Sequence, residues 1–442
     1  MPDAAHSRPS APPDPPGRLN VLLVGGGGRE HALAWKLRQS PRVADLFTTH
    51  PDNPGIADLA QPIDCPFELA NTFRLERFCV RAGVNLVVIG PEAPLASGLA
   101  DRLKANVPGA AVLGPGAEGA RLESSKSFAK KMMRAAAIPT AEGRVFTDPR
   151  DAKAFLQTRE HAYVVKASGL AAGKGVVVPA SLKEAIDAVD RIMVKREFGD
   201  AGAEVVIEEK LKGGEASVFA LIDGSTIAVL ETAQDYKRLG DGDTGPNTGG
   251  MGAVSPAPAL DDATLDRVQR EVLVPLVDTL RREEIDFRGV LYVGLMLTPG
   301  GPKVLEFNTR FGDPECQALM PRLTGDLAEI LYRTASGSLE RAEIAWDPRP
   351  SCCVVLASRG YPGESEKGAA ITGVDAARRA GAEVFHASAR REAGGLVSGG
   401  GRVLSVVALG DTPDDARAAA NAAADAITFE GKTHRRDVGS GA

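Results

Sequence analysis

Short apolar runs alternate with amphipathic segments over residues 19–113, and this alternation restricts the fold more than any other feature of the chain. The run LNVLLVG, Leu19–Gly25, is typical of a buried strand, and the segment after it has the apolar spacing of a helix. Strand-like runs recur as DLFTTH, VNLVVIG and AAVLGP. Parallel strands need long crossover connections, so strands that alternate with helices predict a parallel sheet. We therefore expect an α/β, Rossmann-like domain over residues 19–122 that binds its ligand at the carboxyl ends of its strands.

Glycine-rich turns follow two of these strands, at GGGGREHA from Gly25 and at GPEAPL from Gly90. A helix N-terminus after such a turn attracts phosphate, and the first run matches part of a dinucleotide-binding fingerprint. The match is incomplete, because the second strand ends in His50 where an acid would hold a ribose. His31, inside the first run, is either catalytic or a packing residue.

Composition restricts the class of protein. The chain has 442 residues and a net charge of −6, and its length fits about three globular domains. A mildly acidic chain has no broad electrostatic attraction for nucleic acid or an anionic membrane, so we expect neither as a partner. None of the five cysteines forms a C-x-x-C pair, and no apolar run is long enough to span a membrane. We expect a cytoplasmic protein.

Residues 1–18 are rich in proline and alanine and contain no apolar run, which excludes a secretory signal. We expect a disordered, proline-rich tail. A transit peptide is the alternative, and Asp3 and Asp14 count against it.

Two further units follow the first domain. The unit over residues 123–344 begins with a lysine-bearing helix and continues with the strands AYVVKA, GVVVPA and EVVIEEKL, a helix with Ser181 and Glu184 as a capping box, a strand in IAVLETAQDY, and a core hairpin of VLYVGLML and PKVLEFN. The last unit, residues 345–442, has the strands SCCVVLAS and RVLSVVALG and a helix capped by Thr412. We expect a small α+β domain there.

The loop SGLAAGKGV, Ser168–Val176, has three glycines around Lys174 and lies between two predicted strands. Its spacing excludes a Walker A loop. It is either a mobile hairpin or a glycine turn whose N–H groups face phosphate oxygens. Lys166 ends the preceding strand, and it correspondingly faces either water or a phosphate.

The stretch VLEFNTRFGDPE, beginning at Val304, contains the strongest candidate for a metal site. Side chains alternate along a strand, so Glu306 and Asn308 share one face while Leu305 and Phe307 face the core. A carboxylate and an amide oxygen at this spacing suit a hard cation such as Mg²⁺. Arg310 continues the face if the strand persists and would fit a carboxylate or a phosphate. The alternative is a surface strand whose polar groups are satisfied by water.

The central stretch DTGPNTGGMGAVSPAP, Asp243–Pro258, is rich in glycine and proline and offers almost nothing for a core. One interpretation is a flexible linker. The other is a loop whose backbone approaches a phosphate or a small substrate closely, which glycine permits.

These motifs together resemble the phosphoribosylamine–glycine ligase family of the ATP-grasp superfamily. The resemblance rests on GGGGREHALAWKL, GPEAPL, KASGLAAGKGV, VIEEKL, QDYKRLGDGDTGPNTGGMGAVSPAP and EFNTRFGDPE, and it covers about residues 19–440. It implies an ATP-grasp domain over residues 123–344 with a mobile lid at about residues 140–205. It also implies a reaction in which ATP phosphorylates glycine and the amine of 5-phosphoribosylamine attacks the resulting glycyl phosphate. The products would be glycinamide ribonucleotide, ADP and phosphate, in the second step of de novo purine synthesis.

The resemblance also implies a role for individual residues. Glu306 and Asn308 would bind Mg²⁺ or Mn²⁺, and Arg310 and Lys166 would be the catalytic residues, Arg310 by holding the glycine carboxylate. The implied ATP contacts are Lys126, Lys166, Gly173, Lys174, Gly175, Glu208, Glu209, Leu211 and Glu215. The implied contacts of glycine and 5-phosphoribosylamine are Gly27, Gly28, Arg29, Asn53, Glu92, Asp235, Arg310 and Asp313. In this scheme Gly27, Gly28 and Arg29 face the phosphate, Glu92 and Asn53 the ribose, and Asp235 the amine of glycine. The implied partners are small molecules only, and we expect a monomer.

The sequence departs from the family pattern at four positions. Gly26 stands where Asn or Ser is usual, Ser168 where Asp is expected, Tyr236 where His is expected and Thr309 where Cys is common. None of these removes a predicted metal ligand or Arg310.

Three other functions remain open on the residues alone. The first is another purine-pathway ligase that uses formate or bicarbonate, against which the central glycine motif counts. The second is a dinucleotide-dependent oxidoreductase, which leaves Glu306, Asn308 and Lys166 without a role. The third is a non-catalytic nucleotide-sensing module.

Overall fold

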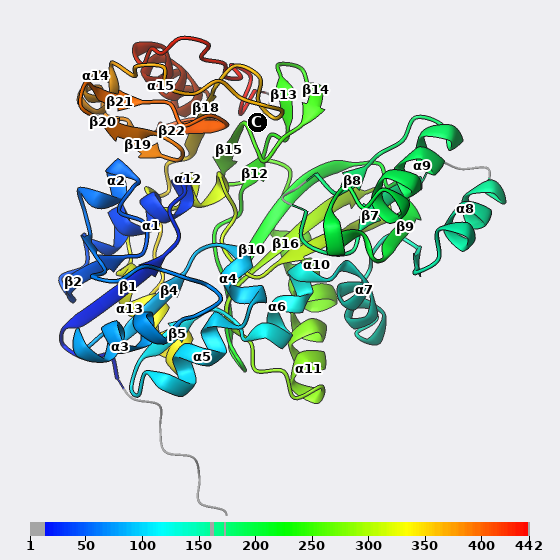
Figure 1. Cartoon of the computed structure of the whole chain (residues 1–442), viewed down its shortest axis with the longest axis horizontal. Coiled ribbons are helices and arrows are strands. Elements are labelled where there is room, and N and C mark those ends of the chain that lie inside the picture. Colours follow the sequence, from blue (N-terminus) through cyan, green and yellow to red (C-terminus); the bar gives the residue numbers. More distant parts are fainter. Residues whose placement is uncertain (1–13, 160–162, 172–173, 441–442) are drawn as a thin grey trace, which may run out of the picture.

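The computed structural model describes residues 14–159, 163–171 and 174–440. Figure 1 shows the N-terminal strands at the lower left, a small sheet projecting to the right and the C-terminal strands above them. No described helix is long and apolar enough to cross a membrane.

The N-terminal unit contains a parallel sheet in the order β3-β2-β1-β4-β5, so the predicted parallel α/β arrangement is confirmed. β1 lies at the centre of the sheet and is buried along nearly its whole length, as strands covered on both faces are. The strands are β1 (Leu19–Val24), β2 (Val43–Thr48), β3 (Gln61–Pro62), β4 (Leu86–Ile89) and β5 (Ala111–Leu113). The helices are α1 (Gly28–Leu37), α2 (Pro54–Ala57), α3 (Phe73–Arg81), α4 (Glu92–Ala96) and α5 (Leu99–Asn106).

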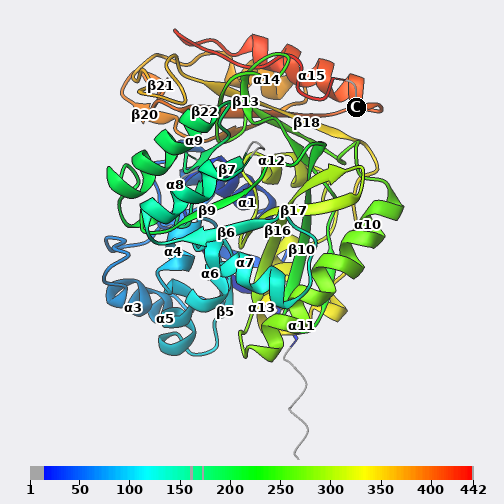
Figure 2. The ribbon, with the colours of Figure 1, turned by 90° about the vertical axis from the view of Figure 1, so that its right-hand side faces the viewer.

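The centre of the molecule is an antiparallel sheet in the order β11-β10-β16-β17. Figure 2 shows three of its strands side by side with helices along one flank. Its strands are β10 (Gly214–Asp223), β11 (Ile227–Val229), β16 (Arg288–Thr298) and β17 (Gly301–Asn308). Its apolar core also includes residues of α7 and of the α10–α11 segment. Two helices follow β5 of the N-terminal unit, α6 (Ala117–Ser124) and α7 (Lys126–Ala135). Two more precede β16, α10 (Asp262–Val268) and α11 (Val274–Arg282), and two follow β17, α12 (Glu315–Leu319) and α13 (Leu327–Ser336).

The hairpin of β16 and β17 is confirmed, but one of its predicted side-chain directions is wrong. Glu306 lies opposite Gly294 while Val304 lies opposite the next residue, Leu295, so Leu305 is an extra residue in a β-bulge. The bulge breaks the alternation, and Val304 and Phe307 are therefore the buried core residues. Leu305 is half-buried and lines the cavity described below.

A smaller antiparallel sheet, in the order β6-β9-β7-β8, contains most of the segment predicted as a lid. Its elements are β6 (Gly143–Phe146), α8 (Pro149–Gln157), β7 (Tyr163–Ala167), β8 (Val176–Val177), α9 (Leu182–Val189) and β9 (Val205–Glu209). Ser181 caps α9 by accepting a hydrogen bond from the Glu184 N–H at 3.2 Å. The capping box is incomplete, because the Glu184 carboxylate accepts from the N–H of Ala180 rather than from that of Ser181.

The C-terminal sheet has the order β12-β15-β18-β22-β19 and crosses the predicted boundary at residue 345. Its strands are β12 (Gln234–Asp235), β15 (Gly252–Ser255), β18 (Ser351–Ala357), β19 (Glu383–His386) and β22 (Arg402–Leu409). The remaining elements of this unit are α14 (Val374–Arg379), α15 (Pro413–Ala426) and the hairpin of β20 (Arg390–Glu392) and β21 (Gly395–Val397). Thr412 caps α15 as predicted, since its hydroxyl accepts from the Asp415 N–H. The single strand expected in IAVLETAQDY is instead two short strands, β11 and β12, in different sheets.

The central glycine-rich stretch is only partly a loop, so its description as a segment with nothing for a core is wrong. β13 (Arg238–Gly240) and β14 (Thr244–Asn247) form an exposed hairpin, and β15 then enters the C-terminal sheet between β12 and β18. Met251, Ala253 and Val254 are buried there. The small residues of the stretch fit a strand whose neighbours approach on both sides, and only Thr248 and Gly249 remain free to line a cavity.

Candidate active site

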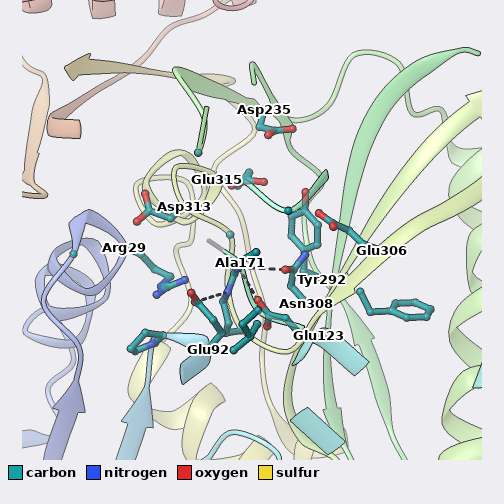
Figure 3. A pocket seen from close by; sticks show the side chains of 18 of the residues that line it. Arg29, Glu92, Glu123, Ala171, Asp235, Tyr292, Glu306, Asn308, Asp313 and Glu315 are labelled. Carbon is teal, nitrogen blue, oxygen red and sulfur yellow. Dashed lines mark hydrogen bonds and ion pairs between the residues drawn. The ribbon is translucent and has the colours of Figure 1, made fainter. Parts of the chain in front are cut away.

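A cavity of about 700 Å³ lies where the units meet. Its walls come from the turn after β1, from α7, β7 and β17, from the central stretch and from the C-terminal unit. Figure 3 shows Arg29, Glu92 and Asp313 on one side of this cavity and Tyr292, Asn308 and Glu306 on the other. Residues far apart in the sequence therefore meet in one site.

Glu306 and Asn308 both line the cavity, as the strand alternation predicted. Burial opposes ionisation of Glu306, but Lys237, Lys126 and Lys166 together hold the pKa of this carboxyl below its ordinary value. Among the residues that the structure describes, no group of three or more His, Cys, Asp and Glu side chains could hold a metal ion. An ion on Glu306 and Asn308 would thus need further oxygen ligands from water or phosphate, which is the usual situation for Mg²⁺.

Three lysines gather at the end of the cavity formed by α7, β7 and β9. Lys126 is the first residue of α7, whose N-cap is Ser125, and burial lowers the pKa of its ammonium group. Lys166 is buried and pairs with Glu208. Lys130, a lysine of the predicted helix that was given no role, pairs with the other oxygen of Glu208 at 2.7 Å. Glu208 therefore holds two cations rather than facing the cavity as a free carboxylate.

The other predicted ATP contacts differ in position. Glu209, Leu211 and Glu215 are not among the described residues that line the cavity, whereas Gly175 is. The Glu209 carboxylate pairs with Lys303 at 2.9 Å and accepts from the Glu142 N–H, so it is already engaged. Glu215 pairs with Lys237 at 2.8 Å. Gly173 lies outside the described residues, and the Lys174 N–H donates to the carbonyl oxygen of Ala171.

Arg310 lies beyond the end of β17, yet its guanidinium group remains in the cavity. Its Nη2 is 2.8 Å from Oε1 of Glu123 and 3.2 Å from Oδ1 of Asn308, and its Nε is 3.5 Å from Glu92. The other oxygen of Glu123 accepts from the Thr309 N–H at 2.8 Å. Glu123 thus fixes both the loop and the arginine. No motif in the sequence indicated Glu123, which lies in the last turn of α6, almost two hundred residues before Arg310.

The turn after β1 is occupied by its own side chains. The Glu30 carboxylate accepts from the Gly27 N–H at 2.7 Å and pairs with Arg29 at 2.6 Å. This arrangement puts a negative charge where a dinucleotide pyrophosphate would bind, which counts against the oxidoreductase interpretation. Gly28 is buried against Gln317, and His31 is a packing residue whose Nδ1 accepts from the His386 N–H.

Asn53 does not reach the cavity. Its side chain is fully buried, caps α2 by accepting from the Gly55 and Ile56 N–H groups, and donates to the carbonyl oxygens of Gly26 and His386. The ribose contact implied for Asn53 has no support in this geometry. Glu92 and Asp313 do line the cavity.

A second group of acids faces the cavity near the central stretch. Asp235 and Glu315 line it together with Lys237, whose ammonium group lies 3.9 Å from Asp235. Burial raises the pKa of both carboxyls. Lys237 lies in the motif that begins QDYKRL, and Glu315 ends the motif EFNTRFGDPE. The sequence thus indicated both motifs but gave neither residue a role.

The C-terminal unit adds residues that the sequence analysis missed. Ser388, Arg390 and Arg402 line the cavity, and Arg402 donates to the carbonyl oxygens of Gly249 and Asp313 at 2.6 Å each. Nothing in the local sequence indicated them, because only the packing of β19 and β22 over α1 and α12 brings them to the site.

Comparison with known proteins agrees with this site. Family models for the phosphoribosylglycinamide synthetase N domain, ATP-grasp (A) domain and C domain match residues 19–123, 124–316 and 351–441. The chain therefore belongs to the phosphoribosylglycinamide synthetase family, and its ATP-grasp fold is the predicted one. It is 48% identical to the phosphoribosylamine–glycine ligase of Rhodopirellula baltica over 429 residues, which is 95% of this chain and 97% of that protein. It is also 48% identical to the trifunctional purine biosynthetic protein adenosine-3 of Gallus gallus, covering 95% of this chain and 42% of that protein. The crystal structure of phosphoribosylamine–glycine ligase from Thermotoga maritima superposes with a TM-score of 0.82 at 33% identity, over 95% of this chain and all of that one.

Proposed function

We propose that this protein joins glycine to 5-phosphoribosylamine at the expense of ATP, through glycyl phosphate, in purine biosynthesis. The observation that carries the proposal is the meeting of Glu306 and Asn308, the lysines of α7 and β7, and Arg310 in one cavity. Carboxylate oxygen is a poor leaving group and must first be phosphorylated. Phosphoryl transfer needs positioning and charge neutralisation more than a protein nucleophile, and these residue types supply both.

The lysine-rich end of the cavity is the proposed ATP site. Lys126 and Lys166 neutralise phosphate charge, and Gly175 faces the same end from the hairpin after β7. The small sheet β6-β9-β7-β8 closes over the nucleotide as a lid and keeps water from glycyl phosphate. Lys130 fixes the Glu208 carboxylate, and Glu208 in turn keeps Lys166 in place before a phosphate arrives.

The residues of β17 fit a divalent cation. Glu306 is held ionised by the surrounding lysines, and Asn308 offers an amide oxygen on the same side of the strand. Mg²⁺ or Mn²⁺ bound there would supply neutralisation of the ATP phosphates. Arg310 then holds the glycine carboxylate while Glu123 fixes the direction of its fork. Asp235 and Glu315 face the amino group of glycine.

The cavity wall shared by the N- and C-terminal units is the proposed site for 5-phosphoribosylamine. Arg29 and the Gly27 N–H are already engaged by Glu30. Arg390 is the less engaged cation on this wall, since its guanidinium lies 3.5 Å from Asp52 and its side chain is 44% exposed. We therefore assign the phosphate to Arg390 and Ser388 in addition to the predicted turn, and the ribose to Glu92.

The test is the release of ADP by the purified protein. We expect release to require a divalent cation, glycine and freshly made 5-phosphoribosylamine together. Glu306→Ala and Arg310→Ala abolish it, while Arg349→Ala, on a surface arginine paired with Asp347, leaves it unchanged. ADP release that ignores the amine would indicate a different ligase. We expect the active protein to be cytoplasmic and monomeric; sedimentation of the purified protein tests the oligomeric state.

A further inference from the structure

The last segment of the chain is bound to the central glycine-rich stretch. Thr433 exchanges two backbone hydrogen bonds with Ala357 of β18, which brings the following residues against the β13–β14 hairpin. Arg435 then points inward. Its side chain is 2% exposed, which makes it the largest fully buried side chain of the described chain.

Every nitrogen of the Arg435 guanidinium has a partner. Nε and Nη2 each lie 2.7 Å from the Asp437 carboxylate, in a bidentate pair. Nη1 lies 2.8 Å from Asp243 and 3.2 Å from the carbonyl oxygen of Arg238. The guanidinium carbon lies 5.1 Å from the ring centre of Tyr236. Arg435 thus contacts Tyr236, which precedes the hairpin, the start of the hairpin, at Arg238, and its turn, at Asp243.

Backbone groups of the same segment extend this attachment. The Gly242 N–H donates to Asp437 at 2.8 Å, and Asp241 accepts from the Arg436 N–H at 2.8 Å. We call Arg435, Asp437 and the backbone of Arg436 the C-terminal clamp. Tyr236 supplies an aromatic face for the arginine of this clamp.

The clamped hairpin leads directly into the cavity. The carbonyl oxygen of Lys237 accepts from both the N–H and the hydroxyl of Thr248, each at 2.8 Å, so the two residues are tied side by side. The Thr248 hydroxyl in turn accepts from the Gly250 N–H. Lys237, Thr248 and Gly249 line the cavity, whereas Arg435 does not.

We propose that Arg435 is a positioning residue of the ligase, which sets the wall formed by Lys237, Thr248 and Gly249 for the substrates from outside the cavity. The inference rests on the proposed function for its kinetic part only. The hairpin is exposed and short, and a two-stranded hairpin alone is marginally stable in water, so its geometry depends on what holds it. The ATP end of the cavity, on α7, β7 and β9, makes no contact with the clamp.

Arg435→Lys tests the proposal, because lysine keeps the charge but lacks the planar fork. The matched control is Arg436→Lys, on the adjacent arginine, whose side chain is 59% exposed and pairs with Asp425. We expect Arg435→Lys to raise KM for glycine or 5-phosphoribosylamine by about tenfold, because a displaced wall loses contacts with these substrates. KM for ATP should rise less, because this wall acts on the metal site only through the charge of Lys237 near Glu306. Arg436→Lys leaves all three constants unchanged. Equal constants for wild type and Arg435→Lys, or a rise in KM for ATP as large as that for the other two substrates, would overturn the proposal.

A measurement without substrates separates this proposal from the proposed function. Amide hydrogen exchange of the free protein should speed up over residues 236–251 in Arg435→Lys, while exchange of β10 and β16 stays as in wild type. Unchanged exchange over 236–251 refutes the clamp even if the protein is an active ligase. Where Arg435→Lys fails to fold, Asp243→Asn decides, because it removes the negative charge that faces Nη1 of Arg435 and changes only an exposed side chain. Asp243→Asn should show the same faster exchange over residues 236–251 and the same change in KM. If it shows neither, the proposal is refuted.

Discussion

Replacing Arg310 by alanine should destabilise the fold, because it leaves Glu123 buried without its cation. The two groups lie 2.8 Å apart, and the side chains are only 18% and 6% exposed. Removing one partner of a buried pair costs about 3–5 kcal/mol of unfolding free energy. Glu92, the second carboxylate near Arg310, is 33% exposed and can be hydrated, so it adds little to this cost.

The loss should depend on pH in a stated direction. Burial already raises the pKa of Glu123 above its ordinary value of 4.5, and Arg310 opposes this rise. Without Arg310 the pKa of the folded state rises further above that of the unfolded state. The folded variant then binds its proton more tightly, so its free energy of unfolding falls as pH increases above 4.5. The difference between wild type and Arg310→Ala is therefore largest at neutral pH and shrinks in acid.

Urea unfolding of four proteins measures this: wild type, Arg310→Ala, Glu123→Gln and the double variant. Glutamine keeps an oxygen that can accept from the Thr309 N–H but carries no charge. The double variant should therefore recover most of the stability that Arg310→Ala loses, and its stability relative to Glu123→Gln should not change with pH, because neither variant carries the Glu123 carboxyl. The reasoning fails if Arg310→Ala is as stable as wild type at neutral pH, or if the double variant is no more stable than Arg310→Ala.

Three further substitutions test other parts of the site. Lys166→Met should raise KM for ATP by about ten- to a hundredfold, because a charged contact with phosphate is lost. The circular dichroism spectrum should stay unchanged, since Glu208 still pairs with Lys130. An unaltered KM for ATP contradicts the assignment of Lys166 to the ATP site. His386 is buried and its pKa is lowered to about 4 by burial, so the protein should lose stability as pH falls from 6.5 toward 4, by about 3 kcal/mol; His386→Gln should remove that part of the slope in urea titrations. Asn53→Ala should lower the free energy of unfolding by about 2–4 kcal/mol through the lost buried hydrogen bonds and leave KM for 5-phosphoribosylamine unchanged, whereas a changed KM with full stability would restore its predicted ribose contact.

Local rules predicted the parts of the site that lie on single elements. The two-residue period of a strand placed Glu306 and Asn308 together, and the structure has them opposite Gly294 and Tyr292, two residues apart on the same side of the hairpin. The same rule failed at Leu305, since a bulge is decided by how β17 meets β16 and not by the sequence of β17 alone. The glycine-rich stretch was misjudged for a similar reason. Small residues predict a loop in isolation, but β15 is a strand because β12 and β18 pair with it.

Residues that act through other residues gave no signal at all. Glu123, Arg402 and Arg435 have no spacing relation to the motifs, and each is an ordinary charged residue in its own segment. Their importance comes from tertiary contacts, with Arg310, with the carbonyl oxygens of Gly249 and Asp313, and with the hairpin. Motifs therefore indicated where ligands bind, while the groups that fix those motifs in place required the fold.

Most cations of this cavity share one property that affects how it selects a ligand. They are already paired with a carboxylate, as Arg29 is with Glu30, Arg310 with Glu123, Lys166 with Glu208 and Lys237 with Glu215, while Lys126 has no ion pair among the described residues. These carboxylates neutralise and orient the cations in a buried place, where an unpaired charge would be costly. An arriving anion must then share the cation with its carboxylate or replace that carboxylate. One phosphate or carboxylate therefore gains little binding free energy from any single pair. A set of substrates that brings a triphosphate, a carboxylate and a sugar phosphate together gains at several pairs at once, and the paired cations thus favour the full set of substrates over isolated anions.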